Sequence, residues 1–130
     1  MKKILTFALL VSVFVLLLTA CGAAKDPSAA AVESYLNALV NKDSSTLSSL
    51  SCADWESSAL LELDSLQAVE TRLEALACTV ESVEADGTTL VVCQGKILAT
   101  YNGEDQELDL SVRTYQVVDQ GGELLVCGYR

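Results

Sequence analysis

The chain has 130 residues, enough for one hydrophobic core, and its 18 acidic against eight basic side chains argue against binding to nucleic acid. It contains no histidine, which excludes Ser-His-Asp and Cys-His catalytic sites and histidine metal ligands. The acidic residues are scattered along the chain, as is typical of a solvated surface, and a docking face for a basic partner is the alternative.

The first 21 residues have the pattern of a bacterial export signal. Lys2 and Lys3 form a basic start, and the apolar run 4–18 follows it. The 15 residues of this run fall short of the about 20 that a membrane-spanning helix needs. A branched apolar residue, two further residues and a cysteine end the segment; these are Leu18, Thr19, Ala20 and Cys21.

These four residues resemble the lipobox of bacterial lipoproteins, in which the chain is cleaved before a cysteine that carries acyl chains. The resemblance implies a signal peptide over 1–20, a lipidated Cys21 with a flexible tether over 21–27, and one domain over 28–130. It also implies that acyl chains such as palmitate anchor the protein to a bacterial membrane, outside the cytoplasm. The alternative is an ordinary secretory signal or an uncleaved anchor, with an incidental thiol at Cys21.

The part that follows the cleavage position is more acidic than the whole chain. Because Lys2 and Lys3 lie in the leader, six basic and all 18 acidic side chains follow Cys21, for a formal charge of −12. Such a surface repels phosphate backbones and anionic lipid head groups. We therefore expect no nucleic-acid partner for the domain.

Three stretches in the first half of the domain have apolar residues at helical spacing. The first covers 28–41, and Asp26-Pro27 before it is a typical helix start. The second covers 44–50, with Asp43 or Ser44 as its cap. The third runs from Asp54 to about Ala75; the alternative is a break into two helices at Asp64-Ser65, although neither glycine nor proline forces it.

The second half has the composition of β-strands. Val, Leu, Thr and Tyr dominate it, and three turn dipeptides, Asp86-Gly87, Asn102-Gly103 and Gly121-Gly122, interrupt it. In the third strand Leu108, Leu110 and Val112 are expected on one face. The predicted strands cover 76–84, 88–101, 107–118 and 123–129.

Helices followed by an antiparallel meander of four strands predict an α+β fold, in which the helices cover the apolar face of the sheet. The segment 32–43 resembles the first helix of small NTF2-like (cystatin-like cone) lipoproteins. The closing segment 121–130 resembles their last strand, with Leu124 in place of the usual tryptophan. The resemblance implies a strongly curved sheet. It does not determine function, because some relatives are enzymes with a pocket inside the cone and others are binding or dimerisation modules.

The four cysteines that follow Cys21 predict two disulfides, because an even number in an exported domain is typical of a disulfide framework. Zinc ligation and a thioredoxin-like site are disfavoured, since no C-x-x-C spacing exists, and reduced core thiols are a further alternative. No metal and no cofactor are expected. The cysteines are Cys52, Cys78, Cys93 and Cys127.

Strand geometry favours a link between Cys78 and Cys93, which a small register change makes neighbours across the Asp86-Gly87 turn. Cys93 and Cys127 would lie two strands apart in a meander, about 9–10 Å, which is beyond the reach of a disulfide. The NTF2-like resemblance implies an extra hairpin near Cys52, beside the last strand, and so favours Cys52 with Cys127. The second pairing, Cys52–Cys78 with Cys93–Cys127, requires strands that are not a simple meander.

Three aromatic residues, Trp55, Tyr101 and Tyr115, are candidates for the lining of a cone pocket, and ordinary packing is the alternative role for each. The acidic segment 102–109 lacks the spacing of a calcium loop and is expected to be a solvated turn. Arg113 stands among acidic neighbours and is expected in a cross-strand pair.

No carboxylate is singled out by the sequence as a catalytic acid or base. Asp109 falls on the polar face of its strand, and Glu62 and Asp64 belong to an amphipathic helix. We therefore expect a non-catalytic module that binds a small molecule or an envelope protein. The alternative is a small cone-pocket enzyme, of isomerase or hydrolase type, that uses a buried carboxylate.

Overall fold

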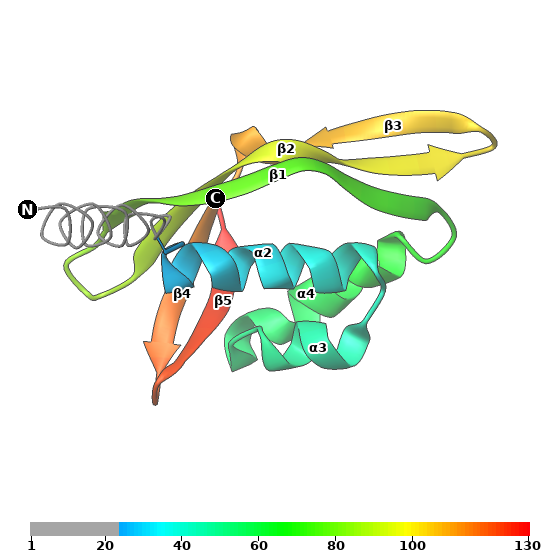
Figure 1. The fold of residues 1–130 in the computed structure, drawn as a ribbon. Helices are drawn as coiled ribbons and strands as arrows, with labels where there is room; N and C mark the ends of the chain where they lie inside the picture. The colour runs from blue at the N-terminus through cyan, green and yellow to red at the C-terminus, as the bar shows by residue number, and fades with distance from the viewer. Residues whose placement is uncertain (1–23) are drawn as a thin grey trace, which may run out of the picture.

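Three helices open the part of the chain that the computed structural model describes, residues 24–130 (Figure 1). They are α2 (Pro27–Val40), α3 (Ser44–Ser49) and α4 (Ala53–Ser65). The export signal and Cys21 lie outside the described residues. Within those residues, no helix has the length and apolar character needed to cross a membrane.

The first two helices begin where the sequence predicts. The Asp26 carboxylate accepts a hydrogen bond from the backbone N–H of Ser28 at 2.8 Å, and Pro27 occupies the first turn of α2. The Asp43 carboxylate caps α3 in the same way, accepting from the N–H of Thr46 at 3.0 Å. Both starts are therefore set by local side-chain chemistry.

The third helix is shorter than predicted. It ends at Ser65, and residues 70–75, expected to be helical, belong to the first strand, β1 (Glu70–Val83). The leucine spacing continues past the end of the helix, but residues 70–74 pair with residues 96–100 of the next strand. Because this pairing satisfies the backbone of both strands, it overrides the local helical period.

The sheet has five antiparallel strands rather than the expected four. After β1 come β2 (Thr89–Tyr101), β3 (Glu104–Asp109), β4 (Thr114–Gln120) and β5 (Glu123–Tyr129). Their order is β1-β2-β4-β5, and β3 pairs with β2 beyond the part of β2 that pairs with β4.

The predicted third strand is split in two by a 3₁₀ turn, η1 (Leu110–Val112). The Asp109 carboxylate accepts a hydrogen bond from the N–H of Ser111 at 2.8 Å, which stabilises this turn locally. The expectation that Val112 shares the inner face with Leu110 is therefore wrong: Leu110 is buried, and Val112 is 73% exposed.

The β1–β2 pair forms an arch over the helices, as Figure 1 shows. The pairing register shifts between Glu74 and Ala77, opposite Gly95, and Ala75 there has a positive φ of 53°. A Cβ atom on Gly95 would lie 2.5 Å from the carbonyl oxygen of Glu74, so only glycine fits this close approach. The bulge makes one face of the sheet concave.

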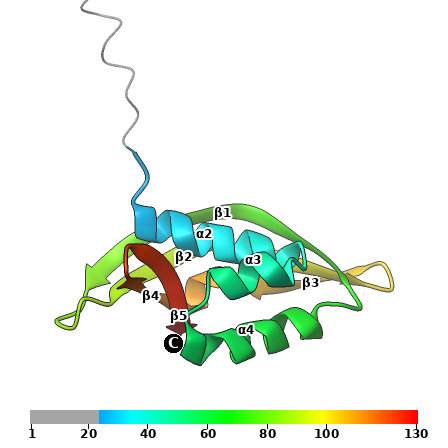
Figure 2. The same ribbon diagram turned by 90° about the horizontal axis from the view of Figure 1, so that it is seen from below.

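The helices pack against the concave face and form the hydrophobic core with it (Figures 1 and 2). Among the described residues, the members of the core lie between Ala29 and Val126 and come from both the helices and the sheet. The largest fully buried side chains of α2 and of the sheet are Val32, Tyr35, Leu36, Leu39, Val91, Ile97, Tyr115, Val117 and Val126.

Helix α2 also closes part of the outer edge of β1. The Glu33 carboxylate accepts a hydrogen bond from the N–H of Cys78 at 2.9 Å, and Lys42 donates to the carbonyl oxygen of Val69 at 2.6 Å. Burial alone would raise the pKa of Glu33, but the hydrogen bonds from Lys25 and Cys78 outweigh it and hold this pKa below its usual value. Glu33 of α2 thus occupies a backbone N–H of β1 that another strand would otherwise bind, and Lys42, in the turn after α2, binds the residue just before β1.

Two disulfides link distant parts of the described chain. Cys78 and Cys93 face each other across β1 and β2 with Cα atoms 4.0 Å apart, after a register shift between Val80 and Ser82. Cys52 joins Cys127 of β5 with Cα atoms 5.2 Å apart. This is the pairing that strand geometry and the NTF2-like resemblance favour. Two disulfides are typical of a protein in an oxidising compartment outside the cytoplasm.

Ser51 brings the segment before α4 against the last strand. It forms a parallel bridge with Val126, and the N–H of Cys52 donates to the carbonyl oxygen of Val126 at 3.0 Å. The helical layer is therefore joined to β5 by backbone hydrogen bonds as well as by the disulfide.

We predict that Gly95→Ala lowers the free energy of unfolding by about 3 kcal/mol, because the new Cβ both collides with backbone and strains a positive φ. Gly87→Ala is the matched control: its φ of 90° is close to the 96° of Gly95, but a Cβ there meets no atom within 4 Å. The control should lose only about 1 kcal/mol. Urea unfolding of both variants measures the difference, and equal losses would contradict the close approach.

Candidate functional site

The three aromatic residues expected to line a pocket do not share one site. Tyr101 lies at the end of β2 and lines an open groove. Tyr115 is fully buried in the core, and Trp55 is half-buried at the start of α4. The Trp55 and Tyr129 rings pack edge to face, with their centroids 5.4 Å apart. Only Tyr101 is therefore placed to meet a ligand.

The groove lies on the concave face of the sheet, at the end that the helices leave uncovered. Figure 1 shows the β2–β3 hairpin extending past the end of α2. The groove has a volume of about 350 Å³. Its walls come from α4 and the following loop (Ser65, Leu66, Val69), from β2 (Ala99, Tyr101) and from β3 (Gln106, Leu108).

Strand alternation explains why these side chains converge. Ala99 and Tyr101 are two residues apart on β2 and so share one face, and the register places Gln106 opposite Ala99 and Leu108 opposite Ile97. Val69 lies on the other side of the groove, and the Lys42 ammonium fixes its position by donating a hydrogen bond to its carbonyl oxygen. The groove is thus built from the sheet and from the loop that replaces the predicted end of the third helix.

The lining is suited to an apolar ligand. Leu66 and Ala99 are buried, Val69 and Leu108 are half-buried, and Tyr101 is 60% exposed. Among these described lining residues there is no Asp, Glu, Lys or Arg. The groove therefore offers apolar surface, a phenol and an amide, which fix and orient a ligand but provide no acid or base for catalysis near neutral pH.

A half-buried ion pair lies on neighbouring parts of α4 and the sheet. Glu62 and Arg113 are 2.7 Å apart, and their side chains are 18% and 19% exposed. The Arg113 guanidinium also lies 4.1 Å from the centroid of the Tyr129 ring. The expectation of a cross-strand partner for Arg113 is therefore wrong, because its partner lies on a helix.

Glu62 was expected only as a residue of an amphipathic helix, but its side chain is largely buried, and its position in the sequence carried a signal of this. Ala59, Leu63 and Leu66 form the buried stripe of α4, and Glu62 falls between them at i+3 from Ala59 and i−4 from Leu66. Its Oε1 binds Arg113, and its Oε2 is buried with no hydrogen-bond partner within residues 24–130. A carboxylate on the apolar stripe of a helix is the pattern that could have identified it.

Four aromatic rings pack beside this ion pair and hold the helices on the sheet. The Trp55 indole N–H donates to the Tyr35 hydroxyl at 3.0 Å, and the Tyr115 ring lies 5.6 Å from the Tyr129 ring by centroids. Burial raises the pKa of Tyr115 to about 12, although the neighbouring Arg113 lowers it. Burial likewise raises the pKa of Tyr35 above its usual value. The mutual packing of the four rings between the helices and the sheet gives this cluster a structural role.

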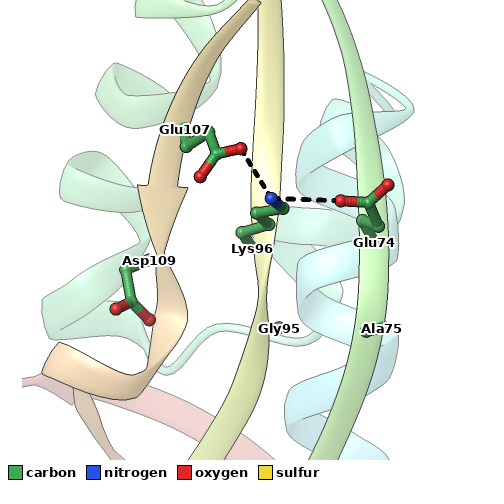
Figure 3. Close-up of a pocket in the computed structure, with 6 residues that line it drawn as sticks. All are labelled: Glu74, Ala75, Gly95, Lys96, Glu107 and Asp109. Carbon is green, nitrogen blue, oxygen red and sulfur yellow. Dashed lines mark hydrogen bonds and ion pairs between the residues drawn. The ribbon is translucent and has the colours of Figure 1, made fainter.

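The convex face of the sheet has a hollow of about 250 Å³ at the Gly95 bulge, drawn in Figure 3. Lys96 lies between Glu107 at 2.5 Å and Glu74 at 3.3 Å, and hydrogen bonds to these two carboxylates raise the pKa of its ammonium. The fourth charged residue there, Asp109, accepts the hydrogen bond from Ser111. In the part of the chain that the structure describes, no group of three or more His, Cys, Asp or Glu is placed to hold a metal ion.

Comparison of the chain with protein-family models, curated proteins and solved structures yields no match. The functional interpretation therefore depends on the geometry of the groove and on the leader. Of the surfaces described above, the groove at Tyr101 is the one that combines a concave shape with apolar side chains.

We predict that Arg113→Ala lowers the free energy of unfolding by about 2 kcal/mol, because it leaves the half-buried Glu62 carboxylate without its cation. Arg72→Ala is the control: Arg72 also pairs with a carboxylate at 2.8 Å, that of Asp105, but its side chain is 55% exposed. Solvent screens that pair, so its loss should leave stability unchanged within error. Equal effects of the two substitutions in urea unfolding would show that the Glu62–Arg113 pair is not structural.

Proposed function

We propose that the protein is a lipoprotein, tethered to a membrane outside the cytoplasm, whose NTF2-like domain binds a ligand in the groove at Tyr101 and catalyses no reaction. One observation carries the binding proposal: an open concave groove with apolar walls and without acidic or basic side chains among its described lining residues. The basic and apolar leader that ends in Leu18, Thr19, Ala20 and Cys21 supports the tether. The two disulfides support an oxidising compartment.

The NTF2-like assignment is supported by architecture. Three helices precede an antiparallel sheet, and the bulge at Gly95 curves that sheet around them. A cone of this kind would place the groove at its open end, beside the β2–β3 hairpin. Of the roles that such domains fill, binding agrees best with the lining of the groove.

The position of the groove, relative to the two ends of α2, agrees with a tethered binding module. Helix α2 begins six residues after Cys21, and its 14 residues span about 21 Å. The other end of the helix is fixed to the groove wall, since Lys42 binds the carbonyl oxygen of Val69. The groove thus lies at the end of α2 that is far from the proposed lipid, where a partner in the envelope can reach it.

An enzyme that uses a buried carboxylate is the second candidate, and the unpartnered Oε2 of Glu62 is the observation in its favour. Two facts weigh against it. Arg113 already binds the other oxygen of this carboxylate, and Glu62 is not among the residues that line the groove. Binding without catalysis is therefore the function we favour.

The lipid anchor predicts that Cys21→Ser prevents acylation. In bacteria grown with an alkyne analogue of palmitate, the unaltered chain should acquire the label and sediment with membranes, whereas Cys21→Ser should lack the label. Gly22→Ser, which changes the neighbouring residue and keeps the thiol, is the matched control and should be labelled fully. Labelling of Cys21→Ser at the control level would refute the anchor.

The groove predicts that Tyr101→Ser weakens binding of an apolar probe, Nile red, to residues 24–130 about tenfold, because it removes a large apolar wall. Val83→Ser is the matched control. Val83 is similarly exposed (64%), but it lies at the end of β1 that is far from the groove, since the other end of β1 pairs with Thr100. Fluorescence titration gives both affinities, and circular dichroism checks that both variants fold. Equal affinities would place the probe outside the groove.

A further inference from the structure

Strand β3 has an unpaired edge beside the groove. It pairs with β2, and no other strand among residues 24–130 pairs with it. The two-residue turn Asn102-Gly103 makes Tyr101 and Glu104 a hydrogen-bonded pair, and such pairs alternate along an antiparallel ladder. The backbone N–H and C=O groups of Asp105, Glu107 and Asp109 are therefore directed away from β2, toward the unpaired edge.

The two faces of β3 differ in chemistry. Gln106 and Leu108 line the groove on the concave face. Asp105, Glu107 and Asp109 alternate onto the convex face. Near this edge, the convex face of β1, β2 and β3 carries five carboxylates and two cations. The carboxylates are Glu70, Glu74, Asp105, Glu107 and Asp109, and the cations are Arg72 and Lys96.

Exposed apolar side chains gather around the same edge. Tyr101 lies at one end of β3, next to the turn, and Val112 lies at the other end, in η1. Of the four large apolar side chains that are exposed among the described residues, these two flank β3, whereas Leu61 lies on α4 and Val83 at the end of β1. Exposed apolar side chains at both ends of an unpaired strand are typical of an interaction surface.

We propose that an extended segment of a partner protein, with alternating basic and apolar residues, adds antiparallel to the unpaired edge of β3. Its apolar side chains lie in the groove, and its basic side chains lie beside Asp105, Glu107 and Asp109 on the convex face. The backbone groups of these three residues supply the hydrogen bonds, and the alternation of side chains supplies the specificity. The proposal rests on the function proposed for the groove and specifies the class of its partner.

Charge selects this partner over a second copy of the chain. Two β3 strands side by side would bring together the carboxylates of Glu104, Asp105, Glu107 and Asp109 from both copies, which repel one another. Acidic residues on an exposed strand thus prevent association of identical chains. The same residues attract a basic strand, and this attraction weakens as salt screens it.

The test uses a fluorescein-labelled peptide of nine residues in which lysine and valine alternate, starting and ending with lysine, and residues 24–130 as its binding partner. Residues directly opposite each other in an antiparallel pair share a face, so the lysines face Asp105, Glu107 and Asp109, and their amides donate to β3. N-methylation of the three inner lysine amides should therefore weaken binding at least tenfold in fluorescence anisotropy. N-methylation of three valine amides, whose N–H groups point away from β3, should leave the affinity within about twofold.

The two methylated peptides have the same composition and charge, so they separate strand addition from simple charge attraction. Equal affinities of the two would overturn the proposal, as would equal binding of a peptide in which glutamate replaces lysine. If no peptide binds while Tyr101→Ser still weakens the binding of Nile red, the partner class is wrong and the proposed function of the groove stands. If Nile red also fails to distinguish Tyr101→Ser from Val83→Ser, the proposed function itself is wrong.

A matched pair of variants tests the protein side. Asp109→Asn removes one charge beside the unpaired edge and keeps an oxygen that accepts the hydrogen bond from Ser111. Asp119→Asn makes the same change at the β4–β5 turn, where Asp119 accepts from the N–H of Gly122 at the same distance of 2.8 Å. The first should weaken binding of the lysine-valine peptide about threefold, and the second should leave it unchanged. Equal effects would place the peptide away from β3.

Discussion

The close approach of Gly95 to the backbone of residues 74 and 75 is the constraint on which the rest of the structure depends. Only glycine fits there, and the bulge that results bends β1 and β2 together. The bend makes the inner face of the sheet concave, so that three short helices cover one part of it and leave the far part open. Without the bend, neither the groove at Tyr101 nor the separation of β3 from the helices would arise.

Two kinds of link hold the helices in the concave face. Backbone and side-chain hydrogen bonds join α2 to the edge of β1, and the Cys52–Cys127 disulfide joins the start of α4 to β5. The Glu62–Arg113 pair then fixes the second half of α4. The Glu33 contact, the disulfide and the ion pair lie outside the groove lining, and Lys42 binds only the backbone carbonyl of Val69. The groove therefore keeps its own side chains available for a ligand.

The surface of the domain combines features that a purely solvated acidic protein would not need. Acidic side chains on the convex face of β3 adjoin an apolar groove on the concave face, and exposed apolar residues stand at both ends of the strand. Under the lipid anchor proposed above, a membrane would hold copies of the protein at high local concentration, and the acidic edge would oppose their association. The same edge remains complementary to a basic, extended partner.

Local chemistry is what the sequence by itself determined: the starts of the first two helices at Asp26 and Asp43, the glycine turns, the α+β order of elements and the presence of two disulfides. Export and a lipid at Cys21 stay predictions from the leader. The helix starts, the turns and the order of elements depend on residues close in the chain, and the two disulfides were predicted from the number of cysteines. The tertiary structure decided that residues 70–75 form a strand, that η1 splits the predicted third strand, and that Glu62 meets Arg113. These outcomes depend on which distant backbone or charge is nearest, and no local pattern of spacing contains that information.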